Sequence, residues 1–140
     1  MADDAVTKPL QTIEIDVRWG DMDAFEHVNN AVYFSFFEQV RAAWLERIYP
    51  DWMTTQDVPI LVTASCNFVK PLTYPATVRV SVSCAEPGRS SLRTLYEMRD
   101  GETDEVYATG EAVVVWIDKT TGKSTPLPEA MRSDIDAHRL

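Results

Sequence analysis

The chain has 140 residues, of which 45% are hydrophobic, and a formal net charge of −9. This is enough apolar material for the core of one ordinary domain, and it excludes a disordered tail. A nucleic-acid-binding domain normally carries a basic stripe, so the acidic balance argues against that class.

The N-terminal segment, MADDAVTKPL, lacks the apolar stretch of a signal peptide. No run approaches the roughly 18 apolar residues of a membrane span. We therefore expect a cytoplasmic protein without a membrane segment, built as one domain over residues 1–140 with a flexible N-terminus of about residues 1–9.

The first predicted elements are a strand and a long helix. TIEIDVRW (residues 12–19) alternates apolar and polar side chains, which is typical of a half-buried strand. The run AVYFSFFEQVRAAWLERIYP (residues 31–50) has helical length. We expect the helix to end before Pro50, with Asn29 or Asn30 as its N-cap. Because apolar side chains fill most of this helix, we expect a sheet to wrap around it.

The rest of the chain predicts strands joined by short turns. The run from Ile60 to Leu72 is nearly all apolar, so we expect both of its faces to be covered. Further strands are predicted at 76–86, 90–99 and 104–118, with Gly110 as a bulge or a point of close approach, and residues 126–140 predict a short terminal helix. The pattern is that of an α+β fold with an antiparallel sheet, one face of which could pair with another subunit.

Two cysteines, Cys66 and Cys84, lie in apolar stretches, with no other Cys or His at metal-ligand spacing. We interpret them as small buried hydrophobic residues and expect no metal site.

The segment RWGDMDAFEHVNN (residues 18–30) concentrates polar groups just before the helix. Taken alone, Asp21 and Asp23 are most simply acids favoured by the helix dipole. The longer stretch DMDAFEHVNNAVYFSFFE, with FVKPL after the helix and GRSSL at a later strand, resembles the hotdog-fold acyl-CoA thioesterases of the 4-hydroxybenzoyl-CoA thioesterase type. The resemblance covers about residues 13–118.

This resemblance implies a hotdog fold, in which an antiparallel sheet of about five strands wraps around one long central helix. It also implies hydrolysis of an acyl-CoA to a carboxylic acid and CoA, without a cofactor, by a homodimer or a homotetramer.

The resemblance also assigns roles around the motif. Asp23 matches the catalytic carboxylate, and the backbone amide of Asn30 or a neighbour matches the group that polarises the thioester carbonyl. Free amides at a helix N-terminus suit the charge that develops on that oxygen. His27 receives a supporting role, because related enzymes pair this histidine with an asparagine where this chain has Phe25. Glu26 stands where the family usually has Gly.

A carboxylate on the central helix catalyses hydrolysis in another hotdog branch, which makes Glu38 the runner-up acid; its simpler interpretation is an ordinary polar-face residue. Residues 64–99 carry five basic and two acidic side chains, a net charge of +3. Taken alone, this charge is most simply that of solvated strand faces. The resemblance implies that the segment supplies the contacts with the CoA phosphates and pantetheine: Lys70, Arg89, Ser90, Ser91 and Arg93.

Two other functions compete with hydrolysis. A non-catalytic hotdog protein that binds acyl thioesters stays open because of Phe25 and Glu26. An acyl-thioester dehydratase is disfavoured, because His27 is followed by VNNAVYF and not by the Gly and Pro of that motif.

Overall fold

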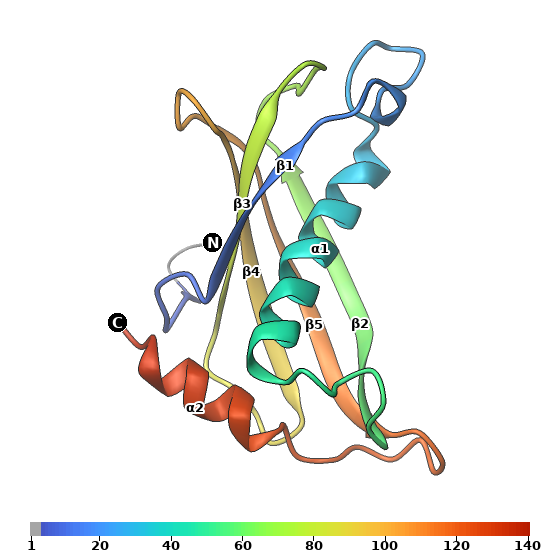
Figure 1. The fold of residues 1–140 in the computed structure, drawn as a ribbon, viewed down its shortest axis with the longest axis vertical. Coiled ribbons are helices and arrows are strands. Elements are labelled where there is room, and N and C mark those ends of the chain that lie inside the picture. Colours follow the sequence, from blue (N-terminus) through green and yellow to red (C-terminus); the bar gives the residue numbers. More distant parts are fainter. Residues whose placement is uncertain (1–3) are drawn as a thin grey trace.

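The computed structural model describes residues 4–140 as an antiparallel sheet with two helices (Figure 1). The elements in chain order are β1 (Gln11–Asp16), a 3-10 turn η2 (Trp19–Asp21), α1 (Asn30–Ile48), β2 (Asp57–Phe68), β3 (Thr77–Cys84), β4 (Ser91–Asp100), β5 (Val106–Asp118) and α2 (Glu129–Ala137). The sheet order is β1-β3-β4-β5-β2. The predicted fold, five antiparallel strands around one central helix, is confirmed.

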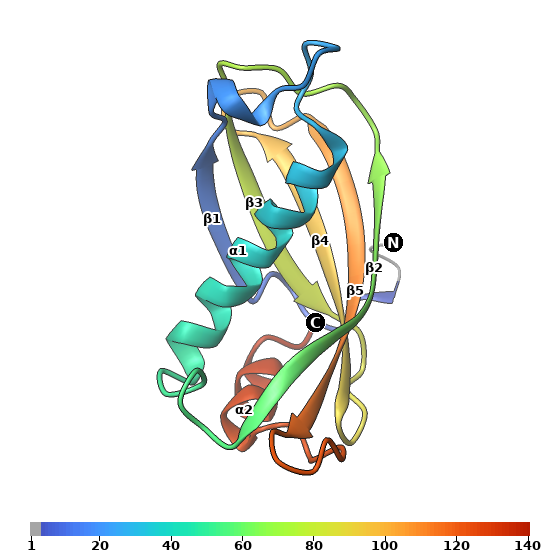
Figure 2. The ribbon, with the colours of Figure 1, turned by 90° about the vertical axis from the view of Figure 1, so that its right-hand side faces the viewer.

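Helix α1 connects the two edge strands of the sheet, β1 and β2, and therefore has to cross its concave face. Figure 2 shows the sheet curving around the helix. The side of α1 that faces the sheet is buried and largely aromatic: Tyr33, Phe36, Phe37, Val40, Trp44 and Leu45. Burying these side chains supplies much of the apolar contact that holds the fold together.

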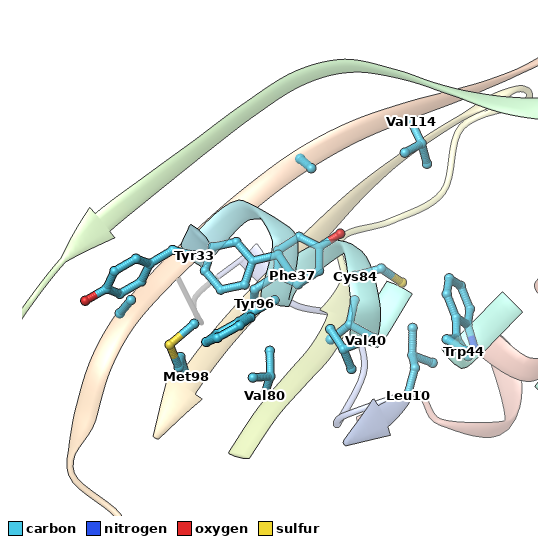
Figure 3. Packing of buried hydrophobic residues seen from close by; sticks show 14 of the residues in the cluster. Leu10, Tyr33, Phe37, Val40, Trp44, Val80, Cys84, Tyr96, Met98 and Val114 are labelled. Carbon is cyan, nitrogen blue, oxygen red and sulfur yellow. The ribbon is translucent and has the colours of Figure 1, made fainter. Parts of the chain in front are cut away.

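The core is tightest where α1 lies over β4 and β5. The ring of Phe37 stacks on that of Tyr96, with centroids 4.8 Å apart (Figure 3). A Cβ at Gly110 would lie 2.5 Å from the Phe37 ring and 2.9 Å from the Ser65 carbonyl oxygen. Pairing between β4 and β5 continues without a shift through Gly110, so this glycine marks a close approach and not a bulge.

The first strand is shorter than its alternation predicted. It ends at Asp16, and Trp19 lies in the 3-10 turn with 75% of its surface exposed. The Asp21 carboxylate accepts hydrogen bonds from the Arg18 backbone N–H (2.8 Å) and from its guanidinium (2.8 and 3.1 Å). These bonds close a turn at the point where the pattern alone would have continued the strand.

Part of the N-terminal segment that we expected to be flexible is hydrogen bonded. The Val6 N–H donates to the Cys84 carbonyl at 2.9 Å, and the Lys8 N–H donates to the His138 carbonyl at 3.0 Å. Thr7 between them is buried. Residues 1–3 of this segment lie outside the described residues.

Strand β2 differs most from expectation. Its apolar run was predicted to be covered on both faces, but residues 60–65 are all exposed in the single chain. The physical reason is position, because β2 is an edge strand with no neighbour on its outer side. The exposed large hydrophobic residues of β2 and the segment after it are Ile60, Leu61, Val62, Phe68 and Val69.

Neither helix in residues 4–140 has the length and apolar character needed to cross a bilayer.

The Asp134 carboxylate of α2 forms hydrogen bonds that join this helix to α1. Asp134 accepts hydrogen bonds from Trp44 Nε1 (2.8 Å) and from two nitrogens of Arg47 (3.0 and 3.1 Å). Burial of the carboxyl opposes ionisation, but the hydrogen bonds from Arg47 and Trp44 outweigh it and lower the pKa of Asp134. The ionised form therefore stabilises the fold.

We expect Asp134→Ala to lower the free energy of unfolding by about 1–3 kcal/mol at pH 7, because it leaves the buried Trp44 Nε1 donor unpaired. A carboxyl with a lowered folded-state pKa stabilises above its unfolded pKa of about 3.9 and loses this contribution as the pH falls through the folded pKa. The gap between wild type and variant should thus shrink in acid. Urea unfolding followed by tryptophan fluorescence at pH 7 and pH 3 measures both effects. Asp136→Asn, at an exposed site on the same helix, is the control and should change stability by less than about 0.5 kcal/mol.

Candidate active site

The loop before α1 is a tight turn held at both ends. The Glu26 N–H donates to the Asp23 carbonyl, and the Asp23 N–H donates to the His27 carbonyl, both at 3.0 Å. The Val28 N–H donates at 2.8 Å to the Leu72 carbonyl, in the segment that follows β2. The loop is therefore fixed against the same end of the sheet at which β2 finishes.

The Asp23 carboxylate has a defined orientation. Oδ1 accepts from the Phe25 backbone N–H at 2.9 Å, and Oδ2 accepts from the side-chain amide of Asn29 at 3.1 Å. The other end of the same side chain caps the helix, because Asn29 Oδ1 accepts from the Ala31 N–H at 2.9 Å. One asparagine thus links the helix N-terminus to the carboxylate.

The first amide of α1 is free. The Ala31 N–H donates to the Asn29 side-chain oxygen, and the Val32 N–H donates to the Asn29 carbonyl at 2.9 Å. The Asn30 N–H, in contrast, makes no hydrogen bond within residues 4–140. A free N–H at the positive end of a 19-residue helix is suited to stabilise a negatively charged oxygen. The structure therefore places a fixed carboxylate and an available amide donor one short loop apart.

The two departures from the family motif have distinct structural roles. Glu26 has φ = 63°, in the left-handed region that glycine adopts without strain. This explains a family preference for Gly at the position. Phe25 is 83% exposed, and Glu26 and His27 are exposed as well, so none of the three side chains is fixed by the core.

Asp21 differs from Asp23 in its surroundings. It is 4% exposed and binds Arg18 through both carboxylate oxygens. Burial opposes its ionisation, but the hydrogen bonds from Arg18 prevail and lower the pKa of Asp21. The arrangement is that of a turn-forming residue.

Lys70 is two residues before Leu72, whose carbonyl accepts the hydrogen bond from the loop, so Lys70 is close to the loop along the chain. Its ammonium group pairs with Glu105 and sits 5.3 Å from the centre of the Tyr107 ring. Glu38 lies further away, since eight residues of helix separate it from Asn30 by about 12 Å. In the single chain the runner-up acid is therefore not beside Asp23.

The remaining predicted CoA contacts lie at the other end of the sheet. Arg89 and Ser90 form the β3–β4 turn, and Ser91 begins β4 opposite Val115. Phe37 of α1 lies at the level of Gly110 on β5, so Asn30 and Ser91 are on the order of 25 Å apart along the sheet. Figure 1 shows the β3–β4 turn beside α2, at the opposite end of the molecule from the start of α1.

Arg93 is on the outer face of the sheet and is already paired. Its guanidinium contacts Glu111 at 2.8 Å and Asp4 at 3.0 Å. It is therefore less available to a phosphate than Arg89, whose described side-chain contact is a 3.3 Å hydrogen bond to Ser124.

The cysteines are poor nucleophiles, because burial raises the pKa of both the Cys66 and the Cys84 thiol to about 11. Within residues 4–140, no group of three or more His, Cys, Asp or Glu side chains is arranged to hold a metal ion.

Comparison with known proteins identifies the family. Residues 17–135 match the sequence model of the thioesterase-like superfamily. The chain belongs to this superfamily. This confirms the predicted resemblance and the prediction of a thioesterase.

Solved structures and a curated relative agree. The PA2801 protein from Pseudomonas aeruginosa is 35% identical, with a TM-score of 0.87 over 91% of this chain and 99% of that chain. A thioesterase from Thermus thermophilus, complexed with coenzyme A and Zn, is 34% identical, with a TM-score of 0.80 over 92% and 93%. The long-chain acyl-CoA thioesterase FadM of Escherichia coli (strain K12) is 27% identical over 91% of this chain and 97% of its own length.

Sequence reasoning missed one part of the site. It identified Asn29 as a possible cap but not as the residue that holds Asp23. In a regular helix or strand, side chains six residues apart do not contact each other. Here the turn at Glu26 brings the Asp23 and Asn29 side chains together.

We expect Asn29→Ala to destabilise the protein by about 1 kcal/mol, because the Ala31 N–H loses its acceptor. Asn29→Ser keeps a short N-cap acceptor but is too short to reach Asp23, so it should recover most of the stability. Both variants should lose thioesterase activity if Asp23 needs this partner. Thermal melts and thiol-release assays on the pair separate the two roles, and full activity in Asn29→Ser would show that the contact with Asp23 is dispensable.

Proposed function

We propose that this protein hydrolyses acyl-CoA thioesters, with Asp23 as the catalytic carboxylate and the Asn30 backbone N–H as the donor to the thioester oxygen. The observation that carries the proposal is the pairing of an oriented carboxylate with an unbonded helix amide. Relatives named for coenzyme A binding and acyl-CoA hydrolysis support the choice of CoA as the thiol.

In this mechanism the Asn30 amide polarises the carbonyl and then stabilises the oxyanion. Asp23 attacks the carbonyl carbon directly or draws a proton from the attacking water, and both routes need the carboxylate ionised and fixed. The carbon–sulfur bond breaks, a carbon–oxygen bond to water replaces it, and the CoA thiolate takes a proton. His27, exposed on the same loop, keeps a supporting role.

The CoA contacts require a second subunit in this proposal. Arg89, Ser90 and Ser91 are too far from Asp23 to serve the same site within one chain. The exposed edge of β2 is an unpaired, apolar template for another strand. Antiparallel pairing of two β2 strands about a two-fold axis sets the Phe68 end of one beside the Asp57 end of the other.

Such pairing moves the β3–β4 turn of each subunit toward the Asp23 loop of its partner. A homodimer with two shared sites follows, and a homotetramer would be a pair of such dimers. Lys70, near the end of β2, then contributes from the same subunit as Asp23. The cytoplasmic location, expected from the N-terminal segment and from the lack of an apolar span, stays a prediction.

We expect Asp23→Asn to lower kcat by at least about 10²-fold, because the amide can neither attack nor accept a proton. Thiol release from a panel of acyl-CoAs measures this. Glu26→Gln removes the same charge from an exposed position of the same loop and should stay within about two-fold of wild type. Undiminished hydrolysis by Asp23→Asn would exclude Asp23. Tight acyl-CoA binding by a wild-type protein without turnover would favour the non-catalytic alternative.

Shared sites predict complementation between two damaged subunits. Asp23→Asn and Arg89→Glu, co-expressed in equal amounts, should give half mixed dimers, each with one intact site, and hence about a quarter of wild-type activity below KM. Each variant alone should be far lower. Sites built within one chain would leave mixed dimers with no intact site, and activity would then not recover.

A further inference from the structure

A groove runs along α1 on the side that faces β2. Two adjoining cavities, of about 140 and 360 Å³, share Glu38, Arg41 and Leu61 in their walls. The first begins at Phe34, one helical turn after Asn30, and the second extends to Trp52 beyond the end of α1. The groove therefore starts beside the candidate active site and leads away from it.

A buried polar chain fixes the Arg41 side chain in this groove. Arg41 Nη1 donates to the Tyr96 hydroxyl at 2.8 Å, which lies 2.6 Å from Thr94 Oγ1, and Thr94 donates to the Ala112 carbonyl at 3.0 Å. Since the Thr94 hydroxyl has one hydrogen, Tyr96 donates to Thr94 and accepts from Arg41. Thr94 and Tyr96 are at most 1% exposed. Figure 3 shows Tyr96 stacked against Phe37, which holds its ring in place.

Glu38 and Glu111 line the first cavity together with Arg41, but within the described residues neither is paired with it, and Glu111 binds Arg93 instead. Within residues 4–140, Arg41 has no carboxylate at salt-bridge distance, although most other arginines of the chain do. Trp116 Nε1 is buried and lacks a hydrogen-bond partner in the same described range. Its indole lines a third, small cavity of about 10 Å³ together with Arg41. A buried donor without an acceptor is costly and calls for an explanation.

We propose that the groove binds the acyl chain of the substrate and that Arg41 selects chains carrying an oxygen acceptor, a hydroxyl or a carboxylate, near their far end. The proposal rests on the proposed acyl-CoA hydrolysis. Phe34, Phe37, Leu61 and Ala64 give the groove apolar walls for the methylene groups. Arg41 meets the end of the chain, where a plain methyl group would offer no acceptor to the N–H groups that are not bonded to Tyr96.

The position of Arg41 along the groove sets the length of the chain whose end can reach it. Eleven residues separate Asn30 from Arg41, about 16 Å along the helix, and the Arg41 side chain points back toward the N-terminus and shortens this to roughly 10 Å. At ~1.25 Å per carbon–carbon bond in an extended chain, a span of roughly 10 Å corresponds to about eight bonds, or a chain of about nine to ten carbons. Arg41 is therefore a specificity-determining residue for chains of medium length.

The test compares three substrates of equal length: decanoyl-CoA, 10-hydroxydecanoyl-CoA and the analogue with a terminal carboxylate. Wild type should prefer one oxygenated substrate over decanoyl-CoA by about ten-fold or more in kcat/KM, the effect of one hydrogen bond to a charged group. The two oxygenated substrates separate hydroxyl from carboxylate recognition. Arg41→Met should remove the preference. Equal kcat/KM for all three in wild type, a preference for decanoyl-CoA, or an equal loss on all three in Arg41→Met would overturn the inference.

Tyr96→Phe keeps the stacked ring but removes the acceptor that orients Arg41, and it should reduce the preference partially. If circular dichroism shows that Arg41→Met does not fold, Tyr96→Phe provides the test in its place. The matched control is Arg99→Met, which removes a cation paired with Glu97 on the outer face of β4 and should leave the preference unchanged.

Calorimetric Kd values for the same three compounds separate the two proposals. If no substrate is hydrolysed, acyl-CoA hydrolysis fails, yet a ten-fold tighter Kd for an oxygenated compound that Arg41→Met abolishes would still support the groove. Equal Kd values in that case would overturn it.

Discussion

The enclosure of α1 by the sheet is the constraint on which the rest of the structure depends. The helix is too apolar to be exposed to water, and its aromatic side is covered only because the sheet curves around it. The close approach at Gly110 and the stacking of Phe37 on Tyr96 set the height of the helix above the strands. Once this contact is made, the start of α1 is fixed at one end of the sheet. Asn29 then orients Asp23 relative to the helix, so the position of the candidate carboxylate follows from core packing.

The same arrangement leaves β2 incomplete. A helix that connects the two edge strands covers the concave face but adds no strand beyond β2, whose apolar residues stay exposed in the single chain. Of the cations predicted to contact CoA, Arg89 lies at the far end of the sheet from Asp23, whereas Lys70 lies close to the Asp23 loop. One feature, the open edge, therefore accounts for both the exposed apolar side chains and the separation of the predicted substrate contacts. The proposed pairing of two β2 edges would resolve both together.

Polar groups inside the groove show how a core can carry specificity. Arg41 is held by a chain of hydrogen bonds that ends on the β5 backbone. The Tyr96 and Thr94 hydroxyls both donate and accept, whereas the described hydrogen bond of Arg41 uses Nη1 alone. A fully satisfied network would only stabilise the fold, whereas one left open toward a cavity also offers a binding contact. Trp116 adds a second open donor nearby.

The sequence by itself determined the order of strands and helix, the turn positions, the helix cap and, through the family motif, the candidate carboxylate. These follow from short-range periodicity, turn chemistry and a contiguous motif. It did not determine that the first strand stops at Asp16, that β2 is exposed, that Asn29 holds Asp23 or that Arg41 meets Tyr96. Arg41 and Tyr96 are 55 residues apart, and β2 has the composition of a covered strand. Only the tertiary structure decided these points, because each depends on which segments become neighbours across the sheet, and local sequence carries no record of that pairing.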